Sequence, residues 1–453
     1  MENDYAFSQE EWENCLKVLS VLKDDPFANP DNQLFGTLVT KVYKNAKKKQ
    51  RSEQSQAKRE QDATTVLSTQ IARQAINGVT TYSDNNPANE HLYTPLEIPQ
   101  NCYCCNESFQ MAHWFYARMC SVCAEENYHH RFSETDLRGR NVVLTGGRVK
   151  IGYATALRIL RCGANLILTT RFPGLAMEQL QAEEDYENWK DRLFVYGLDL
   201  RNFSAIQDFI VFCKTRFGHL DILINNAAQT IRYTPEYYAP LIYQEENCLI
   251  RFQNSFPVLK NNTLVSDTIQ LLGNNEIVVD LPLNRFGQPV DNREKNSWNS
   301  SLTDIELPEL IEVNLINHIA PYMLIKELKP LLEQSPFEER FIVNVTSSEG
   351  MFSYTNKTAH HPHTNMTKAA LNMLTLTSGQ EFAKEGIYMT AVDVGWISTG
   401  ARESLRREQF DRGYIPPLDP VDGASRIMHP IIRGMHKEYF FGLLLKNYKV
   451  SNW

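Results

Sequence analysis

The chain has 453 residues, more than one ordinary domain, so two or three folding units are expected. Its composition is globular, with 42% hydrophobic and 22% charged residues, and its formal net charge of -8 gives no electrostatic reason to expect a nucleic-acid partner. The longest apolar runs, such as residues 165–169 and 439–445, are too short to cross a bilayer, so no membrane segment is expected.

Residues 1–90 are predicted to form a helical extension. Ser8 and Glu11 have the spacing of a capping box, and a second helix is expected from about Phe35 through a charge-rich run. Acidic residues interleave with the basic ones in that run, which favours a solvated helix face over a nucleic-acid patch. Residues 78–97 are polar and indicate a linker. After the capping box, apolar residues recur at helical spacing: Trp12, Leu16, Leu19 and Leu22.

The start of the chain and its cysteines bear on its location. Residues 1–12 have neither the basic end nor the apolar stretch of a secretory signal. The nine cysteines are odd in number, and Cys162 and Cys213 lie in patterns typical of buried helix. These features indicate a reducing compartment, so we expect a cytoplasmic protein.

Residues 98–130 contain two CxxC pairs, Cys102 with Cys105 and Cys120 with Cys123, fourteen residues apart. Each pair has the spacing of a zinc knuckle, and two knuckles complete a tetrahedron of sulfur around one ion. Because all four positions would be filled by protein ligands, the pattern predicts a structural zinc and not a catalytic one. The aromatic-rich run 111–116 is expected to pack the module against the next domain, and a role in binding a partner stays open.

From residue 137 to residue 453, short apolar runs alternate with amphipathic segments. Such alternation predicts an α/β fold, a doubly wound parallel sheet of the Rossmann type. Residues 231–307 break the rhythm with a polar, asparagine-rich interval, which we interpret as an insertion beside the active site. The predicted strands are residues 141–145, 165–170, 192–199, 221–227, 340–347 and 387–395.

A glycine-rich turn follows the first of these strands and opens a helix. Glycines in that context let the backbone approach a pyrophosphate at the helix N-terminus. The next strand ends at Arg171, where enzymes that select NAD place a carboxylate, whereas arginine accommodates a 2′-phosphate, so NADP(H) is the predicted cofactor. The predicted contacts in the turn are Thr145, Gly146, Gly147, Arg148, Lys150, Ile151 and Gly152.

These motifs, and those that follow them in order, resemble the short-chain dehydrogenase/reductase family over residues 138–453. The resemblance implies reversible hydride transfer between NADP(H) and the carbonyl or alcohol of a small-molecule substrate, and a possible homo-oligomer. It implies further cofactor contacts from the third and fourth strands and from the segment after the last: Asp199, Leu200, Asn226, Ala227 and Thr399. It also implies catalytic roles for Asn314 as a proton-relay residue, Ser347 as the serine that orients the carbonyl, and Lys368 as the lysine that binds the nicotinamide ribose.

The chain departs from the family at several positions, two of which bear directly on the site. Lys150 stands where the family usually has a glycine, and Thr364 stands where it has the tyrosine that exchanges a proton with the substrate. A threonine hydroxyl is too weak an acid for that work. The loop before Lys368 offers Tyr354, which we assign as the proton donor, and the histidines His360, His361 and His363. The alternative is a catalytically inactive, NADP(H)-binding scaffold or sensor that acts through protein partners.

Overall fold

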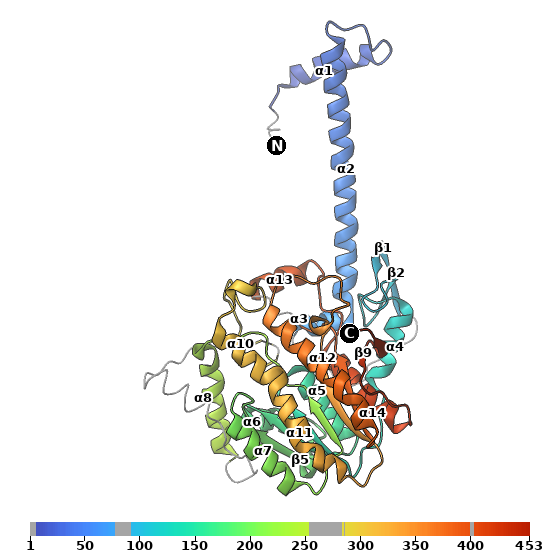
Figure 1. Cartoon of the computed structure of the whole chain (residues 1–453). Coiled ribbons are helices and arrows are strands. Elements are labelled where there is room, and N and C mark those ends of the chain that lie inside the picture. Colours follow the sequence, from blue (N-terminus) through green and yellow to red (C-terminus); the bar gives the residue numbers. More distant parts are fainter. Residues whose placement is uncertain (1–5, 78–91, 253–282, 285, 399–402) are drawn as a thin grey trace. The chain divides into compact units, whose positions relative to one another are not determined.

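Figure 1 shows the computed structural model, which describes residues 6–77, 92–252, 283–284, 286–398 and 403–453. The chain divides into two compact units, Met1–Asp62 and Ala63–Trp453. This division lies inside a long helix. In the described part of the chain, none of the helices is both long enough and apolar enough to span a membrane.

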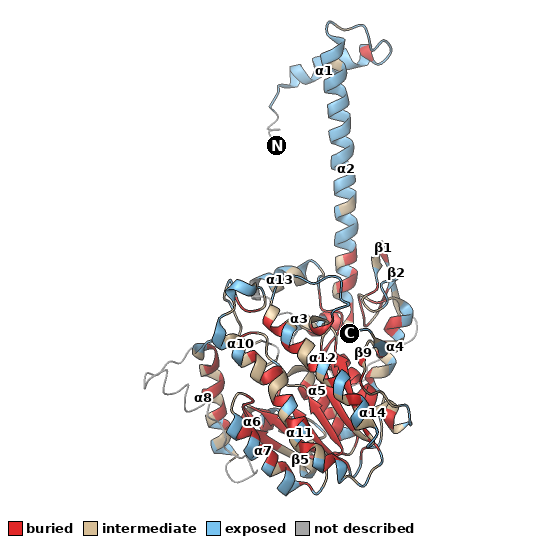
Figure 2. Ribbon diagram, in the orientation of Figure 1, coloured by how far each residue is buried: buried red, intermediate tan, exposed pale blue. Residues whose placement is uncertain are grey.

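The first unit is helical, as predicted. Helix α1 (Gln9–Leu22) begins with the predicted capping box, in which the Ser8 hydroxyl accepts from the Glu11 amide at 3.2 Å and the Glu11 carboxylate accepts from the Ser8 amide at 2.7 Å. Helix α2 (Asn32–Ser68) continues into the second unit. Both helices are largely exposed in Figure 2.

The second unit is built on an eight-stranded sheet in the order β10-β9-β8-β7-β6-β3-β4-β5. Only β10 runs antiparallel to its neighbour among these described strands. The strands are β3 (Asn141–Thr145), β4 (Asn165–Thr170), β5 (Leu193–Gly197), β6 (Ile222–Asn225), β7 (Arg340–Thr346), β8 (Ile387–Asp393), β9 (Leu444–Lys446) and β10 (Lys449–Ser451). The predicted strands are confirmed. Strand β9 overlaps the end of the apolar run 439–445 and β10 follows it, and no strand was predicted for either.

Successive side chains of a strand point to opposite faces of a sheet, and in this sheet the side chains on both faces are buried. Val142 and Leu144 belong to one hydrophobic cluster and Val143 to the other. Figure 2 shows the strands almost entirely buried beneath the helices. Helices α5 (Lys150–Arg161) and α14 (Pro420–Met435) contribute to the first cluster, and α7 (Phe203–Arg216) and α11 (Ala320–Glu333) to the second. The doubly wound α/β fold is therefore confirmed.

The cysteine module lies within the same unit. It consists of β1 (Tyr93–Asn101) paired antiparallel with β2 (Ser108–His113), followed by α4 (Ser121–Arg131). Strand β1 begins inside the predicted linker, whose residues 78–91 lie outside the described part, so the prediction of a linker up to residue 97 is wrong. At the end of α4 the buried Arg131 pairs with Asp419 at 2.8 Å and Asp422 at 2.9 Å, which anchors the module to α14.

The described part of the predicted insertion contains helix α8 (Pro235–Arg251), which packs on α6 (Pro173–Gln181). The residue before α6 provides no side-chain cap. Instead the buried carboxylate of Glu245, on α8, accepts from the amides of Gly174 at 2.7 Å and Leu175 at 2.8 Å. The insertion thereby satisfies the free amides at the start of α6. The other α-helices in the described part of the chain are α3 (Gln70–Asn77), α10 (Leu307–Asn314), α12 (Pro362–Ala383) and α13 (Glu403–Asp411).

Candidate active site

The glycine-rich turn connects β3 to α5 and is tied to the end of β6. The Thr145 hydroxyl accepts from the amides of Asn226 and Ala227, both at 3.0 Å. The Asn226 side chain in turn donates to the Gly146 carbonyl at 3.0 Å. Strands β3 and β6 are neighbours at the point where the strand order reverses, and open α/β sheets bind their ligands in the crevice at that point.

Two glycines of the turn are required by its geometry. Gly146 has φ of 70°, and a Cβ on Gly152 would lie 2.0 Å from the Gly146 carbonyl oxygen. Lys150 has φ of 53°, in the left-handed region that favours glycine. This conformation explains the glycine that the family usually has there, and a lysine at the same position costs about 1–2 kcal/mol of backbone strain.

The start of α5 fits a phosphate. Val149, the residue before the helix, provides no side-chain cap for the amides of the first turn. Such amides, together with the positive end of the helix dipole, form an anion site. Ile151, in that first turn, also lines the large cavity described below, so the two sites are continuous.

Two arginines lie beside this turn. The Arg148 guanidinium is buried 5.3 Å from the centroid of the Phe172 ring, and Arg171 donates to the Tyr238 hydroxyl at 3.4 Å. Burial, and then repulsion by Arg171, lowers the pKa of Arg148 to about 10. A buried and a half-buried cation that repel each other suit a doubly charged phosphate, which is the group that distinguishes NADP from NAD.

Asp199 and Leu200, predicted to contact adenine, follow β5 and are both buried. The Asp199 carboxylate accepts hydrogen bonds from the Arg201 side chain, among them one from Nε at 3.0 Å and one from Nη2 at 2.7 Å. Burial opposes the ionisation of Asp199, but the pair with Arg201 outweighs it and lowers the pKa of the carboxyl. The carboxylate is thus engaged by Arg201, and its contact with adenine stays a prediction.

A cavity of about 1150 Å³ brings most of the predicted catalytic residues together. Ser347, Tyr354, Thr364 and Lys368 all line it. Two of the loop histidines, His360 and His361, line it as well. The third, His363, is buried, and its Nε2 lies 3.0 Å from the Thr230 carbonyl oxygen.

Lys368 and Thr364 lie one turn apart on α12. The Lys368 ammonium donates to the Val345 carbonyl at 2.9 Å, and burial lowers the pKa of this lysine to about 8. The Thr364 hydroxyl is buried and has no hydrogen-bond partner among the described residues. The position of the family's tyrosine therefore holds a side chain that faces the cavity but forms no hydrogen bond there.

A tyrosine and a histidine of the loop, Tyr354 and His361, line the cavity. The Tyr354 ring is 39% exposed, and the Lys446 ammonium lies 5.3 Å from its centroid. The His361 ring stacks on Trp298 with centroids 4.7 Å apart, and its Nδ1 lies 2.8 Å from the Trp298 carbonyl oxygen. The opposite nitrogen of His361 lies 3.9 Å from Glu349.

The structure places Asn314 away from the cavity lining, with its side-chain amide donating to the Leu310 carbonyl at 2.6 Å. Asn317, three residues on, is buried in a π-helical turn between α10 and α11. Its side chain accepts from the Gln229 amide at 2.8 Å and donates to the Thr367 hydroxyl at 3.0 Å. Asn317, and not Asn314, thus connects the end of β6 to α12.

Several cavity residues were not predicted. Lys446, on β9, donates to the Ser348 hydroxyl at 2.8 Å and pairs with Asp393 at 3.3 Å. The predicted nicotinamide segment ends at Thr399, which lies outside the described residues, whereas its earlier residue Trp396 lines the cavity. Tyr103 and Tyr414 also line the cavity and were not predicted. They come from segments far apart in the chain, which no spacing motif connects.

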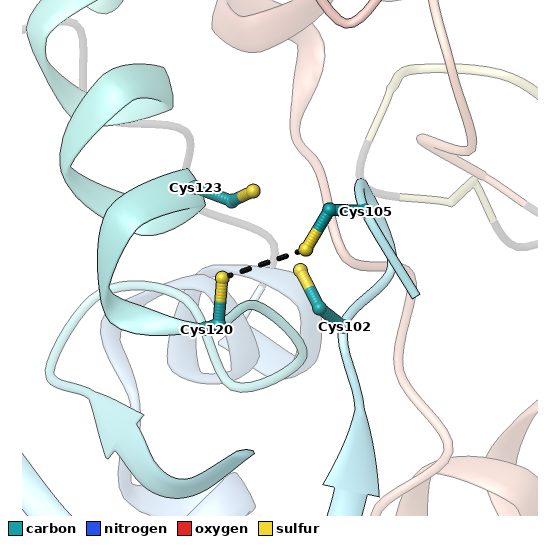
Figure 3. A group of neighbouring side chains, drawn as sticks. All are labelled: Cys102, Cys105, Cys120 and Cys123. Atoms are coloured by element: carbon teal, nitrogen blue, oxygen red, sulfur yellow. Dashed lines mark hydrogen bonds between the residues drawn. The ribbon is translucent and has the colours of Figure 1, made fainter. Parts of the chain in front are cut away.

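The four cysteines of the two CxxC pairs gather at one point, as Figure 3 shows. Their sulfurs all lie within 4.8 Å of one another, and those of Cys105 and Cys120 are 3.7 Å apart. A tetrahedron of sulfurs with metal bonds of about 2.3 Å has edges of about 3.8 Å. The arrangement fits a single zinc ion. Cys104 is not part of the group, and its sulfur accepts from the Asn127 side chain at 3.7 Å.

A family model and individual proteins are similar to this chain. The short chain dehydrogenase family model matches residues 140–239, from β3 to the start of α8. An uncharacterized protein of Acanthamoeba polyphaga mimivirus is 34% identical over 349 residues, which are 73% of this chain and 71% of that protein. The (+)-neomenthol dehydrogenase of Capsicum annuum is 30% identical over 118 residues, 24% of this chain and 38% of the plant enzyme.

Solved structures of low sequence identity are also similar. NADPH-bound carbonyl reductase from chicken fatty liver is 20% identical, with 70% of this chain and 100% of that chain covered and a TM-score of 0.45. The Pseudomonas aeruginosa RhlG/NADP complex is 16% identical, with 68% and 95% covered and a TM-score of 0.45. On its sheet, its glycine-rich turn and its sequence relatives, this chain belongs to the short-chain dehydrogenase/reductase family of oxidoreductases.

Proposed function

We propose that the protein transfers a hydride between NADP(H) and the carbonyl or alcohol group of an organic small molecule. The observation that carries the proposal is one cavity that is lined both by Ile151 of the glycine-rich turn and by Ser347 and Lys368. When bound, NADPH supplies the hydride that reduces a carbonyl carbon, and NADP takes it back in the reverse direction. The protein has to bind both ligands, orient them and supply the proton.

The cofactor residues of the proposal lie along the carboxyl edge of the sheet. The first turn of α5 holds the pyrophosphate, and the pair Arg148 and Arg171 holds the 2′-phosphate. Lys368 binds the nicotinamide ribose through its ammonium, which is the main form at neutral pH because its pKa is about 8. The remaining contacts are assigned to Thr145, Gly146, Gly147, Lys150, Ile151, Gly152, Asp199, Leu200, Asn226, Ala227 and Thr399.

On the substrate side, the Ser347 hydroxyl donates a hydrogen bond to the carbonyl oxygen and orients it. The Tyr354 hydroxyl gives a proton to that oxygen during reduction, and its phenolate takes one from the alcohol during oxidation. Asn317 is assigned a positioning role, because its side chain fixes both Gln229 and Thr367 beside the cavity, and proton relay by Asn314 stays a prediction.

The second cofactor of the proposal is a structural zinc ion held by Cys102, Cys105, Cys120 and Cys123. Four thiolates fill its coordination sphere, so it supplies folding energy and not chemistry. All nine cysteines are free in the structure. This state agrees with a reducing compartment, and we assign the protein to the cytoplasm.

The first experiment is a titration of the purified protein with NADPH and with NADH, followed by nicotinamide fluorescence. We expect tighter binding of NADPH. Arg171→Ala should weaken NADPH binding by about tenfold or more, since hydrogen bonds to charged groups contribute about 1.5–3 kcal/mol, and should leave NADH binding nearly unchanged. Arg161→Ala is the matched control, because Arg161 pairs with Asp185 at the other end of α5. Failure of both nucleotides to bind would overturn the proposal.

Turnover is tested separately with a panel of aldehydes and ketones. Ser347→Ala should abolish carbonyl reduction while NADPH still binds, because Ser347 is assigned to the substrate and not to the cofactor. A wild-type protein that binds NADPH but reduces none of the panel would count against the oxidoreductase and in favour of a nucleotide-binding scaffold.

A further inference from the structure

Tyr103 belongs to the cysteine module, yet it lines the active-site cavity. It stands between the two zinc-ligand positions Cys102 and Cys105. Its phenol oxygen accepts from the backbone amide of Trp396 at 2.8 Å. The approach is close, since a Cβ on Gly395 would lie 3.0 Å from the same oxygen.

The second knuckle reaches the same turn from another side. Arg118, two residues before Cys120, places its guanidinium 5.3 Å from the Trp396 ring centroid and 5.1 Å from that of Tyr414. The two rings themselves lie 5.2 Å apart. The Tyr103 amide donates to the Arg118 carbonyl at 2.9 Å, which joins the two knuckles directly.

The Gly395–Trp396 turn is part of the cavity wall. Both residues line the cavity, and the Gly395 amide donates to the Asp393 side chain at 2.9 Å. In the described part of the chain, no acceptor takes the hydrogen of the Tyr103 hydroxyl. This hydroxyl therefore holds the turn through its oxygen and can still donate a hydrogen bond to a ligand in the cavity.

We propose that Tyr103 is a positioning residue of the active site, and that the zinc centre holds it there. Through Tyr103 and Arg118 the cysteine module fixes the backbone and the indole of Trp396, so the module forms one wall of the ligand cavity. Metal occupancy then controls the shape of the site in addition to the stability of the chain. The identity of the ligand rests on the proposed function, whereas the contact between the module and the turn does not.

The test is amide hydrogen exchange at Trp396, measured without any cofactor. Tyr103→Phe removes the acceptor and keeps the ring, so exchange at Trp396 should become roughly fivefold faster, as expected for loss of one hydrogen bond. Amides of the central strands β6 and β7 should exchange at unchanged rates. Tyr93→Phe is the control, because the Tyr93 hydroxyl lies in the same module but donates to Glu125 at 2.6 Å.

Removal of zinc with a chelator should speed exchange at Trp396 in the same way in the wild-type protein. If chelation also exposes β6 and β7, the protein has unfolded, and the Tyr103→Phe variant alone decides. An unchanged Trp396 rate in that variant would overturn the inference.

NADPH affinity is the second readout. It should fall severalfold in Tyr103→Phe and stay unchanged in Tyr93→Phe. A wild-type protein that does not bind NADPH, but whose Trp396 exchange responds as expected, would overturn the proposed function and support this inference.

Discussion

The glycine-rich turn and the loop between β7 and α12 border the same cavity, but they are built in different ways. In the turn, the backbone conformation of Gly146 and the close approach at Gly152 fix the site within a few residues. In the loop, the site depends on side chains from distant segments, among them Trp298 of the insertion and Lys446 of β9. A site that depends on backbone geometry needs particular residues at fixed spacing, which gives a sequence motif. A site that depends on side chains from distant segments can be formed by different residues, so it leaves no such motif.

The largest effect on activity is expected at the proton donor, which belongs to the loop and not to the turn. Tyr354→Phe should lower kcat by about 10²–10⁴ with little change in NADPH affinity, since a positioned acid or base contributes that much. Steady-state kinetics with a carbonyl substrate measures it. Tyr243→Phe, on an exposed tyrosine of α8 outside the cavity lining, is the control.

The Tyr354→Phe variant also allows a test in which a second substitution restores activity. In Tyr354→Phe, the further change Thr364→Tyr restores a phenol at a position that lines the cavity one turn before Lys368. We expect part of the lost activity to return. Full activity of Tyr354→Phe alone would contradict our assignment and move the role to His361, with His361→Gln as the next variant.

The cysteine module gives the next largest effect, on stability. Cys102→Ser with Cys105→Ser removes half of the metal ligands, so the melting temperature should fall by roughly 10 °C or more and the bound zinc should be lost. Differential scanning calorimetry and metal analysis measure both. Cys15→Ser, an exposed cysteine outside the module, should change neither. A zinc content of zero in the wild-type protein would contradict the prediction.

The sheet and the turn could be predicted because their signals are local. Strand alternation and a glycine-rich turn occupy short stretches whose burial and φ angles follow from the residues themselves. Strand β9 has three residues, too few for a pattern, and its position depends on pairing with β8. The sequence also did not indicate that the cysteine module lines the cavity, because the contact of Tyr103 with Trp396 joins segments far apart in the sequence.

The two asparagines show the same limit at shorter range. Asn314 and Asn317 stand in one helical pattern, and the sequence alone favoured the first. A π-helical turn over residues 315–319 inserts a wider turn between α10 and α11, which changes the face that each residue presents. Asn317 then faces Gln229 and Thr367, whereas Asn314 bonds back to its own helix.

A smaller effect is expected from pH. Burial lowers the pKa of Lys368 to about 8, so its ammonium is lost as pH rises above that value. NADPH affinity should therefore weaken as pH rises from about 7 to about 9.5, and Lys368→Arg, which keeps its charge, should remove most of this dependence. Isothermal titration at several pH values measures it. An equally steep loss of affinity in the arginine variant would assign the effect to another group.

Stability should change in the opposite direction over part of that range. An unfolded lysine keeps its proton up to about pH 10.5, so between about pH 8 and about pH 10.5 the unfolded state binds more protons than the folded state. The Lys368 contribution to the free energy of unfolding therefore rises with pH in this window. A thermal melt of Lys368→Met against the wild-type protein isolates that contribution, because the variant cannot titrate there.

The smallest effect concerns Thr364 itself. Its hydroxyl is buried without a partner among the described residues, whereas the hydroxyl of Thr375, on the same helix, accepts from Asn344 at 2.9 Å and donates to the Leu371 carbonyl at 3.0 Å. Thr364→Val should be neutral or stabilise by up to about 1 kcal/mol, and Thr375→Val should destabilise by about 1–2 kcal/mol, because only the second breaks hydrogen bonds. Urea unfolding of the pair measures both. If the two variants were equally destabilised, the Thr364 hydroxyl would have a hydrogen-bond partner in solution. This part of the cavity wall would then depend on one fixed side chain, as the turn depends on its glycines.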